Sequence, residues 1–217
     1  MNVEKGAVVS GEFSREYWEE RYRTHSVDHG AEPNPQLTQE VAALAPGAAL
    51  DAGCGVGADA LWLAARGWRV TAVDISATAL DRARERAGEW GDEVAGRIEW
   101  MRADLAEWAP PEGRFDLVTA HYVHPSTSND ALFRRLAAAV APGGTLLVVG
   151  HQPSDEAGHP HAPAPESHIT ADEVAALLEP GEWDIDVAEA RVRHTMRHGE
   201  EITLHDAVLR ARKRQEA

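Results

Sequence analysis

Short apolar runs alternate with amphipathic segments of helix length through the middle of the chain. Five runs rich in apolar and β-branched residues predict strands at 48–52, 68–73, 97–101, 115–120 and 145–149. The segments between them predict helices at 58–66, 76–90 and 129–140, whereas 104–113 has room for one helical turn at most. Parallel strands need crossover connections, so this order favours a doubly wound α/β sheet with helices on both faces.

The N-terminal region predicts a helix that precedes this alternation. Ser14 is a capping residue, and Tyr17, Trp18 and Tyr22 follow it at near-helical spacing. Turn-forming residues then predict a loop, and a second helical pattern occupies 36–44. Packing against the core would also explain these aromatic residues. We nevertheless expect residues 1–35 to form a helical lid.

The C-terminal region predicts a loop, a helix and a hairpin. Residues 151–168 are rich in Pro, His and small residues, which favours a loop. Thr170 and Glu173 form a capping-box pattern that predicts a helix over 170–178. Alternating segments at 183–192 and 201–209, separated by a turn at 197–199, predict a β-hairpin.

Composition and charge narrow the class of protein. The 217 residues are 43% hydrophobic and 26% charged, which predicts one globular domain over 1–217. The net charge of −15 opposes nucleic acid and anionic membrane surfaces and favours a small ligand. Cys54 is the single cysteine, which suits a reducing compartment, and the sequence has neither a membrane-spanning run nor an export signal. We therefore expect a cytoplasmic protein, a monomer or homodimer.

The most informative motif is a glycine loop between the first predicted strand and the helix at 58–66. Gly53, Gly55 and Gly57 allow the backbone to approach a ligand at the carboxyl end of the strand. The spacing Gly53-x-Gly55-x-x-Ala58 also fits a dinucleotide fingerprint, so the glycines alone do not select a cofactor.

Three carboxylates at strand ends indicate which cofactor the glycine loop binds. Asp51, Asp74 and Asp104 close the first three predicted strands, whose carboxyl ends meet at one edge of a doubly wound sheet. We expect Asp74 to accept the hydroxyls of a ribose, Asp104 the amino group of adenine, and Asp51 to lie near an ammonium or sulfonium. Helix capping is the alternative role for Asp74 and Asp104. S-adenosylmethionine carries all of these ligand groups.

The motif Leu50-Asp51-Ala52-Gly53-Cys54-Gly55-x-Gly57 resembles motif I of the class I S-adenosylmethionine-dependent methyltransferases. Further family motifs follow in order at 70–76, 103–105, 115–118 and 141–144. The resemblance implies a Rossmann-like seven-stranded sheet, mostly parallel, with an antiparallel last strand. It also implies a set of cofactor-binding residues, namely Asp51, Gly53, Cys54, Gly55, Gly57, Asp74, Ile75, Asp104, Leu105 and His121.

The opening Tyr17-Trp18-x-x-Arg21-Tyr22, followed by residues 33–37, is similar to the tellurite-resistance and thiopurine-methyltransferase-like branch of that family. This resemblance implies an N-terminal helix that closes over the cofactor. Trp18 and Tyr22 are therefore expected to bind the cofactor.

Histidines surround the expected place of methyl transfer. His121 and His124 follow the fourth strand and His151 follows the fifth, so all three are candidate general bases for a hydroxyl or amine acceptor. A thiol or chalcogenide acceptor needs only proximity. A locally hydrogen-bonded histidine is the alternative for His124 and His151. A metal site at His151, His159, His161 and His168 lacks suitable spacing, and we expect no metal.

Two other function classes fit the same fold. An NAD-dependent oxidoreductase of the short-chain type needs a Tyr-x-x-x-Lys motif, and the only lysines are Lys5 and Lys213. A non-catalytic S-adenosylmethionine-binding protein would keep the crevice without an acceptor site.

Overall fold

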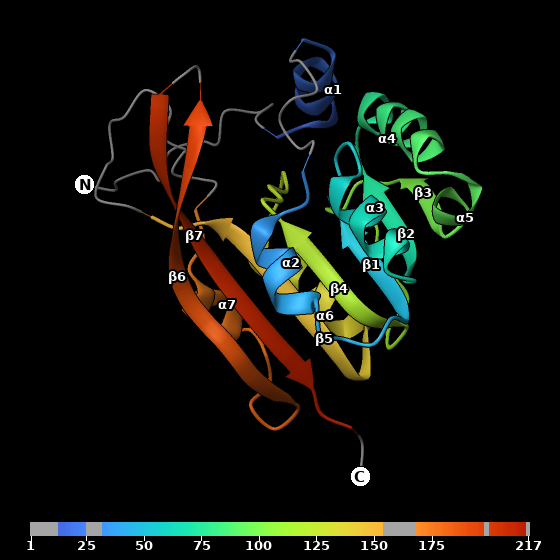
Figure 1. Cartoon of the computed structure of the whole chain (residues 1–217). Coiled ribbons are helices and arrows are strands. Elements are labelled where there is room, and N and C mark those ends of the chain that lie inside the picture. The colour runs from blue at the N-terminus through green and yellow to red at the C-terminus, as the bar shows by residue number, and fades with distance from the viewer. Residues whose placement is uncertain (1–12, 25–31, 154–167, 198–199, 216–217) are drawn as a thin grey trace.

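A seven-stranded sheet forms the centre of the computed structural model, which describes residues 13–24, 32–153, 168–197 and 200–215 (Figure 1). The strand order is β3-β2-β1-β4-β5-β7-β6. β1 to β5 run parallel, and β7 is antiparallel to both of its neighbours. The predicted fold class is therefore confirmed. The strands are β1 (Ala48–Ala52), β2 (Arg69–Asp74), β3 (Ile98–Arg102), β4 (Phe115–His121), β5 (Val140–His151), β6 (Trp183–Arg197) and β7 (Glu200–Lys213).

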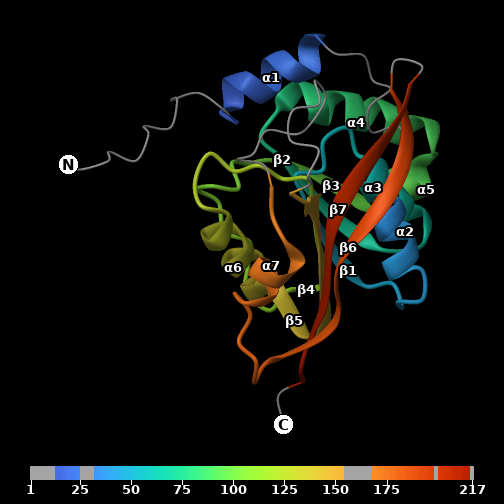
Figure 2. The same cartoon turned by 90° about the vertical axis from the view of Figure 1, so that its left-hand side faces the viewer.

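Helices cover both faces of the sheet (Figure 2). Neighbouring strand residues point to opposite faces. Leu146 and Val148 of β5 accordingly pack in the core under α6 and α7, whereas Leu147 and Val149 pack in the core under α2, α3 and α4. The helices are α1 (Arg15–Thr24), α2 (Pro35–Val41), α3 (Ala58–Ala65), α4 (Ala77–Glu89), α5 (Asp92–Ala95), α6 (Asn129–Ala139) and α7 (Ala171–Ala175).

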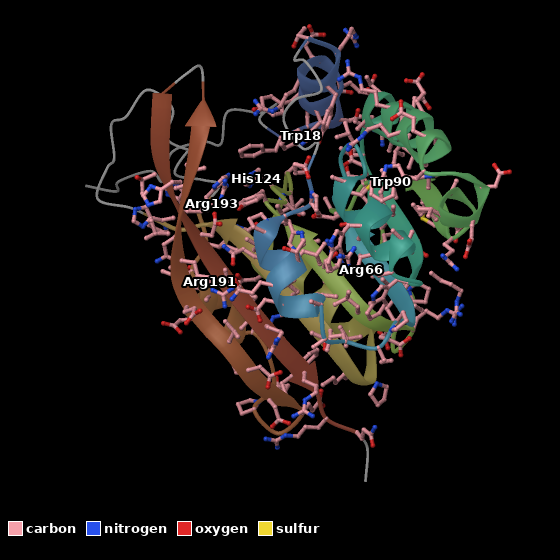
Figure 3. The ribbon with its side chains drawn as sticks, viewed as in Figure 1. Trp18, Arg66, Trp90, His124, Arg191 and Arg193 are labelled. Atoms are coloured by element: carbon pink, nitrogen blue, oxygen red, sulfur yellow. The ribbon has the colours of Figure 1, made fainter. Side chains whose placement is uncertain are left out.

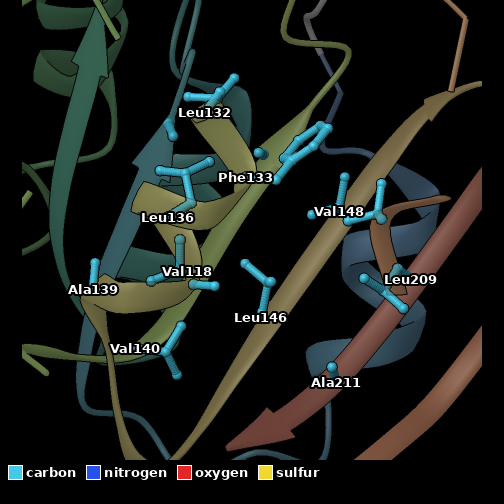
Figure 4. Close-up of a cluster of buried hydrophobic side chains, with 14 of the residues drawn as sticks. Val118, Leu132, Phe133, Leu136, Ala139, Val140, Leu146, Val148, Leu209 and Ala211 are labelled. Carbon is cyan, nitrogen blue, oxygen red and sulfur yellow. The ribbon is translucent and has the colours of Figure 1, made fainter. Parts of the chain in front are cut away.

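The core under α6 is closely filled by aliphatic side chains (Figure 4). Leu136 of α6, Val118 of β4 and Leu146 of β5 are fully buried there. Leu209 of β7 joins the same cluster. The antiparallel hairpin is thus part of the main core and holds β5 in place from the outer side.

Several element boundaries differ from the sequence predictions. β5 starts at Val140 rather than at 145, because Val140 pairs with Phe115 and an irregularity in the register accommodates the Pro-Gly-Gly segment. α2 and α7 end earlier than predicted, and their last residues form turns. The one-turn helix α5 follows Gly91. It was not predicted, because its few residues show no strong helical pattern of hydrophobic positions. The segment 104–113 forms turns without a helix, as expected.

The hairpin is longer than predicted, because pairing continues past Val192 to the pair Arg197 and Glu200. His198 and Gly199 of the predicted turn lie outside the described residues, as do residues 1–12 and 25–31 and most of the predicted loop, including His159 and His161. Within the described ranges, none of the helices has the length and apolar character needed to cross a bilayer.

Candidate functional site

The three predicted carboxylates lie at the carboxyl ends of neighbouring strands. Asp51 is in β1, Asp74 ends β2, and Asp104 follows β3 by two positions. Since β1, β2 and β3 are adjacent and parallel, their carboxyl ends share one edge of the sheet. α1 lies above this edge in Figure 1.

The glycine loop is fixed to the end of β2. The backbone N–H groups of Gly53 and Cys54 both donate to the Val73 carbonyl, at 2.8 and 2.9 Å. Gly57 has a φ of 81°, and a Cβ there would lie 2.5 Å from the ring of Trp100. Both the backbone conformation and the available space therefore require glycine at position 57.

Cys54 is buried within this loop. Burial raises the pKa of its thiol, and the carboxylates of Asp74 and Asp51 raise it further. A thiol held protonated is a poor nucleophile. Cys54 therefore fills space beneath the loop.

The Asp74 carboxylate lies against the glycine loop. Its Oδ2 accepts a hydrogen bond from the Gly55 N–H at 2.8 Å, and its Oδ1 accepts one from the Ser76 N–H at 2.9 Å. Burial raises the pKa of Asp74, and these backbone donors oppose the increase. Each carboxylate oxygen has two lone pairs, so each oxygen retains capacity for one more donor. A ribose diol supplies two such donors.

Two buried polar atoms near the loop have no hydrogen-bond partner among the described residues: Asp51 Oδ2 and His121 Nε2. The other oxygen of Asp51 accepts from the Thr119 hydroxyl at 3.3 Å, and His121 Nδ1 lies 2.7 Å from Asp59 Oδ2. Burial, followed by the charge of Asp59, raises the pKa of Asp51 to about 7. An unsatisfied buried polar group costs about 1–3 kcal/mol, so the pair indicates a ligand with polar donors.

Asp104 caps the turn that follows β3. Its Oδ1 accepts from the Ala106 N–H at 2.8 Å, while Oδ2 has no hydrogen bond among the described residues. Leu105 beside it is buried, and Ile75 is half-buried at the start of the next crossover. Asp74 and Asp104 thus each accept hydrogen bonds from backbone N–H groups and keep free acceptor capacity, but neither caps a helix, since Ser76 caps α4 and no helix follows Asp104.

α1 is attached to the site through Glu19. The Glu19 carboxylate accepts hydrogen bonds from the Ser76 hydroxyl at 3.0 Å and from the N–H groups of Ala77 and Thr78 at 2.7 and 3.2 Å. Burial opposes ionisation of Glu19, but the hydrogen bonds outweigh it and lower the pKa to about 2. Glu19 thereby provides a negative charge at the N-terminus of α4.

The same helix places Tyr22 on the glycine loop. A Cβ on Gly55 would lie 2.8 Å from the Tyr22 hydroxyl. Burial and the charge of Asp74 raise the pKa of Tyr22, so its hydroxyl stays protonated. α1 itself buries no residue completely. The helix therefore covers the loop without forming part of the core.

Stacked rings line the side of the site at the ends of β4 and β5. The centroids of Trp18 and His124 are 6.2 Å apart with 12° between planes, and those of His124 and His151 are 5.8 Å apart with 16°. His151 stacks in turn on Tyr122 at 4.6 Å. The structure thus brings together His124, His151 and Trp18, whereas His121 pairs with Asp59 at the start of α3.

Burial, together with Arg21 and His168, lowers the pKa of His124 to about 4. Burial, together with His124 and Arg193, lowers the pKa of His151 to about 3. Both rings are therefore neutral at physiological pH.

The ring stack ends at an ion pair from the hairpin. Arg193 Nε donates to both oxygens of Asp206, at 3.2 and 2.9 Å, and the guanidinium lies 5.5 Å from the Tyr122 ring centroid. The Tyr122 hydroxyl donates to Asp206 at 2.8 Å, and Gln36 Nε2 donates to it at 3.3 Å. In Figure 3, Trp18, His124 and Arg193 follow one another from α1 toward the hairpin.

Sequence reasoning missed four polar residues of this site, for different reasons. Asp59 stands in the first turn of α3, where an acidic residue is expected for the helix dipole alone. Glu19 is one of several acidic residues of α1. Asp206 and Arg193 lie in the hairpin, and Asp206 is a charged residue on the buried side of a strand. The charged Asp206 at a position where the alternation of the strand predicts a hydrophobic residue was the one feature of the sequence that could have indicated its role.

No group of three or more His, Cys, Asp or Glu side chains within the described ranges is arranged to hold a metal ion. His151 and His168 are joined by a backbone bridge.

Comparison with known proteins gives this geometry a family. Residues 49–144 match the family model described as a methyltransferase domain. This match and the methyltransferase relatives support the predicted class of S-adenosylmethionine-dependent methyltransferases.

Trans-aconitate 2-methyltransferase of Paracidovorax citrulli is 35% identical over 170 residues, which cover 76% of this chain and 59% of that protein. The chain thus spans about 60% of the length of the trans-aconitate methyltransferases it matches.

Two solved structures extend the likeness over nearly the whole chain. A structure from work on the conversion of a disulfide bond into a thioacetal group during echinomycin biosynthesis is 27% identical, covers 94% of both chains and has a TM-score of 0.71. The 1,6-didemethyltoxoflavin-N1-methyltransferase of Burkholderia thailandensis, solved with its substrate and S-adenosylhomocysteine, is 22% identical, covers 98% of this chain and 94% of that one, and has a TM-score of 0.65. At that identity the second structure supports the fold alone.

Proposed function

We propose that the chain transfers the methyl group of S-adenosylmethionine to a small-molecule acceptor. The observation that carries this proposal is a pair of buried atoms beside a glycine loop held by Asp74: Asp51 Oδ2 and His121 Nε2 have no hydrogen-bond partner in the part of the chain that the structure describes. A ligand with an ammonium group next to a ribose could donate hydrogen bonds both to these two atoms and to Asp74. A dinucleotide instead brings phosphates toward Asp51, Asp59 and Asp74, where like charges repel.

The proposed cofactor contacts follow from the free acceptor capacity of the site. Asp74 accepts hydrogen bonds from the ribose hydroxyls, and Asp104 accepts one from the adenine amino group. Ile75 and Leu105 contact the adenine ring. Asp51 and His121 face the ammonium group. Gly53, Cys54, Gly55 and Gly57 supply the loop backbone, and Trp18 and Tyr22 cover it as part of a lid formed by residues 1–35.

When bound, S-adenosylmethionine supplies an electrophilic methyl group whose leaving group is a neutral thioether. The protein's task is therefore to orient the acceptor in line with that methyl group and to exclude water. Trp18, His124 and His151 offer stacked apolar ring faces for this task.

The proposed role of His124 and His151 is positioning. A general base works best with a pKa near the operating pH, and pKa values of about 4 and about 3 make both imidazoles weak bases. His121 is paired with Asp59 and is assigned to the cofactor. Of the acceptors predicted above, a thiol or chalcogenide fits these weak bases better than a hydroxyl or a protonated amine.

The small-molecule acceptor is supported by the name of the relatives that act on trans-aconitate. The tellurite-resistance and thiopurine-methyltransferase-like branch remains a proposal that rests on the residues around Trp18. A cytoplasmic location, supported by the single cysteine, and a monomeric or homodimeric state complete the proposal.

Calorimetry with S-adenosylmethionine and NAD tests the cofactor. We expect binding of the former alone, and Asp74→Ala should weaken it by about tenfold or more, because two charge-assisted hydrogen bonds are lost. Asp92→Ala, at an exposed position of α5, is the matched control. Tight binding of NAD, or unchanged affinity in folded Asp74→Ala, contradicts the assignment. Release of S-adenosylhomocysteine with an acceptor panel then distinguishes an enzyme from a non-catalytic binding protein.

A further inference from the structure

Two arginines, Arg21 and Arg193, border the acceptor side of the site in an acidic protein. The chain has a net charge of −15. The charged neighbours that shift the pKa values of His124 and His151 are nevertheless cationic or imidazole groups, with Arg21 on the lid side and Arg193 on the hairpin side. Coulomb interactions weaken with distance and are screened over about 8–10 Å at physiological salt, so a ligand here responds mainly to these nearby groups.

Arg193 is held in one orientation by a buried partner. Asp206 is fully buried and binds the guanidinium through Nε alone. Among the described residues, neither terminal amino group of Arg193 has an ion-pair partner; the guanidinium also interacts with the Tyr122 hydroxyl, and the Arg193 side chain is 25% exposed. Asp206 is itself held by Tyr122 and Gln36. The guanidinium is thus fixed at one edge and open at the other, which suits binding of a planar anion.

The nucleophile of the reaction must be compatible with the weakly basic imidazoles and the guanidinium on the acceptor side. Methylation of a hydroxyl or thiol releases a proton, and the imidazoles next to the acceptor are weak bases. A carboxylate is already ionised at neutral pH and needs no base. Its planar pair of oxygens also matches the open edge of a guanidinium.

We propose that the acceptor is a carboxylic acid, bound through its carboxylate by the Arg193 guanidinium, which Asp206 positions next to the Tyr122, His151 and His124 rings. The inference rests on the proposed methyltransferase function. A carboxylate oxygen of the acceptor forms a bond to the methyl carbon, the bond from that carbon to sulfur breaks, and its electron pair stays on sulfur. The carboxylate and the sulfonium become a neutral methyl ester and a neutral thioether, and no proton is released or consumed.

The first experiment identifies the product. The full chain is incubated with S-adenosylmethionine labelled in its methyl group and with trans-aconitate, citrate, succinate, benzoate, 2-mercaptoethanol, catechol or histamine. We expect label in at least one carboxylic acid, in a form that alkali releases as methanol. The trimethyl ester of trans-aconitate, which has no free carboxylate, should accept none. Methylation of the thiol, catechol or amine alone overturns the carboxylate proposal but leaves the proposed function intact. Failure to bind S-adenosylmethionine overturns both.

The second experiment tests Arg193. In Arg193→Gln, the KM for the methylated carboxylic acid should rise tenfold or more, while the affinity for S-adenosylmethionine stays within twofold. Arg193→Lys keeps a positive charge beside Asp206 and should fold as the parent does, but it lacks the planar fork, so we expect an intermediate KM. Arg212→Gln is the matched control, since Arg212 is an exposed arginine of β7 that pairs with Asp184. An unchanged KM in folded Arg193→Gln or Arg193→Lys contradicts the role of the guanidinium.

Discussion

The Asp59 carboxylate lies 2.7 Å from Nδ1 of His121, although the two residues are 62 positions apart in the chain. The other oxygen of Asp59 accepts a hydrogen bond from the Asn34 N–H at 2.7 Å. Asp59 therefore connects the start of α3, the end of β4 and the residue that caps α2. In a neutral ring, this partner places the proton on Nδ1 and leaves Nε2 as an acceptor for a ligand N–H.

Asp59→Asn should weaken S-adenosylmethionine binding by about tenfold while the sheet stays folded. The amide removes the charge that orients His121, and loss of a charge-assisted hydrogen bond changes a free energy by about 1.5–3 kcal/mol. Calorimetry measures the affinity, and circular dichroism checks the fold. Asp81→Asn, at an exposed position of α4, is the control. Equal affinities in the two variants contradict a role for the Asp59 and His121 pair.

Asp51 should make cofactor binding depend on pH. Burial, and then the charge of Asp59, raises the pKa of Asp51 to about 7 in the free protein. An ammonium ligand favours the ionised form, so its affinity should fall as the pH falls below this value. We expect a decrease of about five- to tenfold from pH 7.5 to pH 6, with nearly one proton released on binding at pH 6.

Calorimetry in two buffers of different ionisation enthalpy measures this proton release. Asp51→Asn should bind more weakly and show a flat profile over the same range. A parent protein whose affinity is constant between pH 6 and 7.5 contradicts this prediction, because Asp51 then either stays ionised throughout or does not interact with the ammonium group.

The part of the site that local sequence specifies was predictable. Asp51, the glycine loop and Asp74 lie at ends of strands with clear apolar patterns, and parallel pairing brings those ends together. Glu19, Asp59, Asp206 and Arg193 were not predictable, because their roles depend on which side chain of another element they meet. A charge on a helix or strand predicts solvent exposure by default. The buried state of Asp206 is a property of the packed hairpin.

The elements of the fold likewise divide into those that local sequence specifies and those that depend on pairing with another element. The central strands and crossover helices were predicted within a few residues because each has its own pattern of hydrophobic positions. The boundaries of β5 and the hairpin depend instead on pairing between strands, as the pair Phe115 and Val140 shows. β5 extends across a segment whose sequence favours a turn because the register with β4 shifts between Phe115 and Leu117.

Glu19 should control attachment of the lid. Glu19→Gln removes the negative charge at the N-terminus of α4, and we expect S-adenosylmethionine affinity to fall by about three- to thirtyfold. Because α1 buries no residue completely, the unfolding temperature should change little. Glu20→Gln, at an exposed position of the same helix, is the control. Deletion of residues 1–24 should likewise leave a folded protein with weaker binding, and aggregation of the truncated chain shows instead that α1 belongs to the core.

Leu136 should be a major contributor to stability. It is fully buried between α6 and the sheet, so Leu136→Ala leaves a cavity and should lower the free energy of unfolding by about 2–5 kcal/mol. Urea denaturation measures the change, and Leu44→Ala, at a half-buried position after α2, should cost less. Equal effects of the two substitutions contradict the central place of Leu136 in the core.

The ring stack allows a base to be distinguished from a stacking surface. His124 lies between the rings of Trp18 and His151, and burial, with Arg21 and His168, lowers its pKa to about 4. Its imidazole is thus neutral at every pH above about 5, and the rate should show no loss near pH 6.5 that belongs to His124. His124→Phe keeps an aromatic face of similar size but has no proton acceptor, whereas His124→Gln keeps polar atoms but loses the ring.

If the ring is a stacking surface, single-turnover methyl transfer should fall less than threefold in His124→Phe and about tenfold or more in His124→Gln, because stacked contacts contribute about 0.5–1.5 kcal/mol beyond burial. The pH dependence of the rate should be the same in the parent and in both variants. If His124 is the base, both variants lose nearly all activity, because neither Phe nor Gln accepts a proton, and the parent shows an acid limb that the variants lack. The affinity for S-adenosylmethionine, measured separately, ensures that the comparison reports the transfer step, and the same pair of substitutions at His151 extends the test to the next ring of the stack.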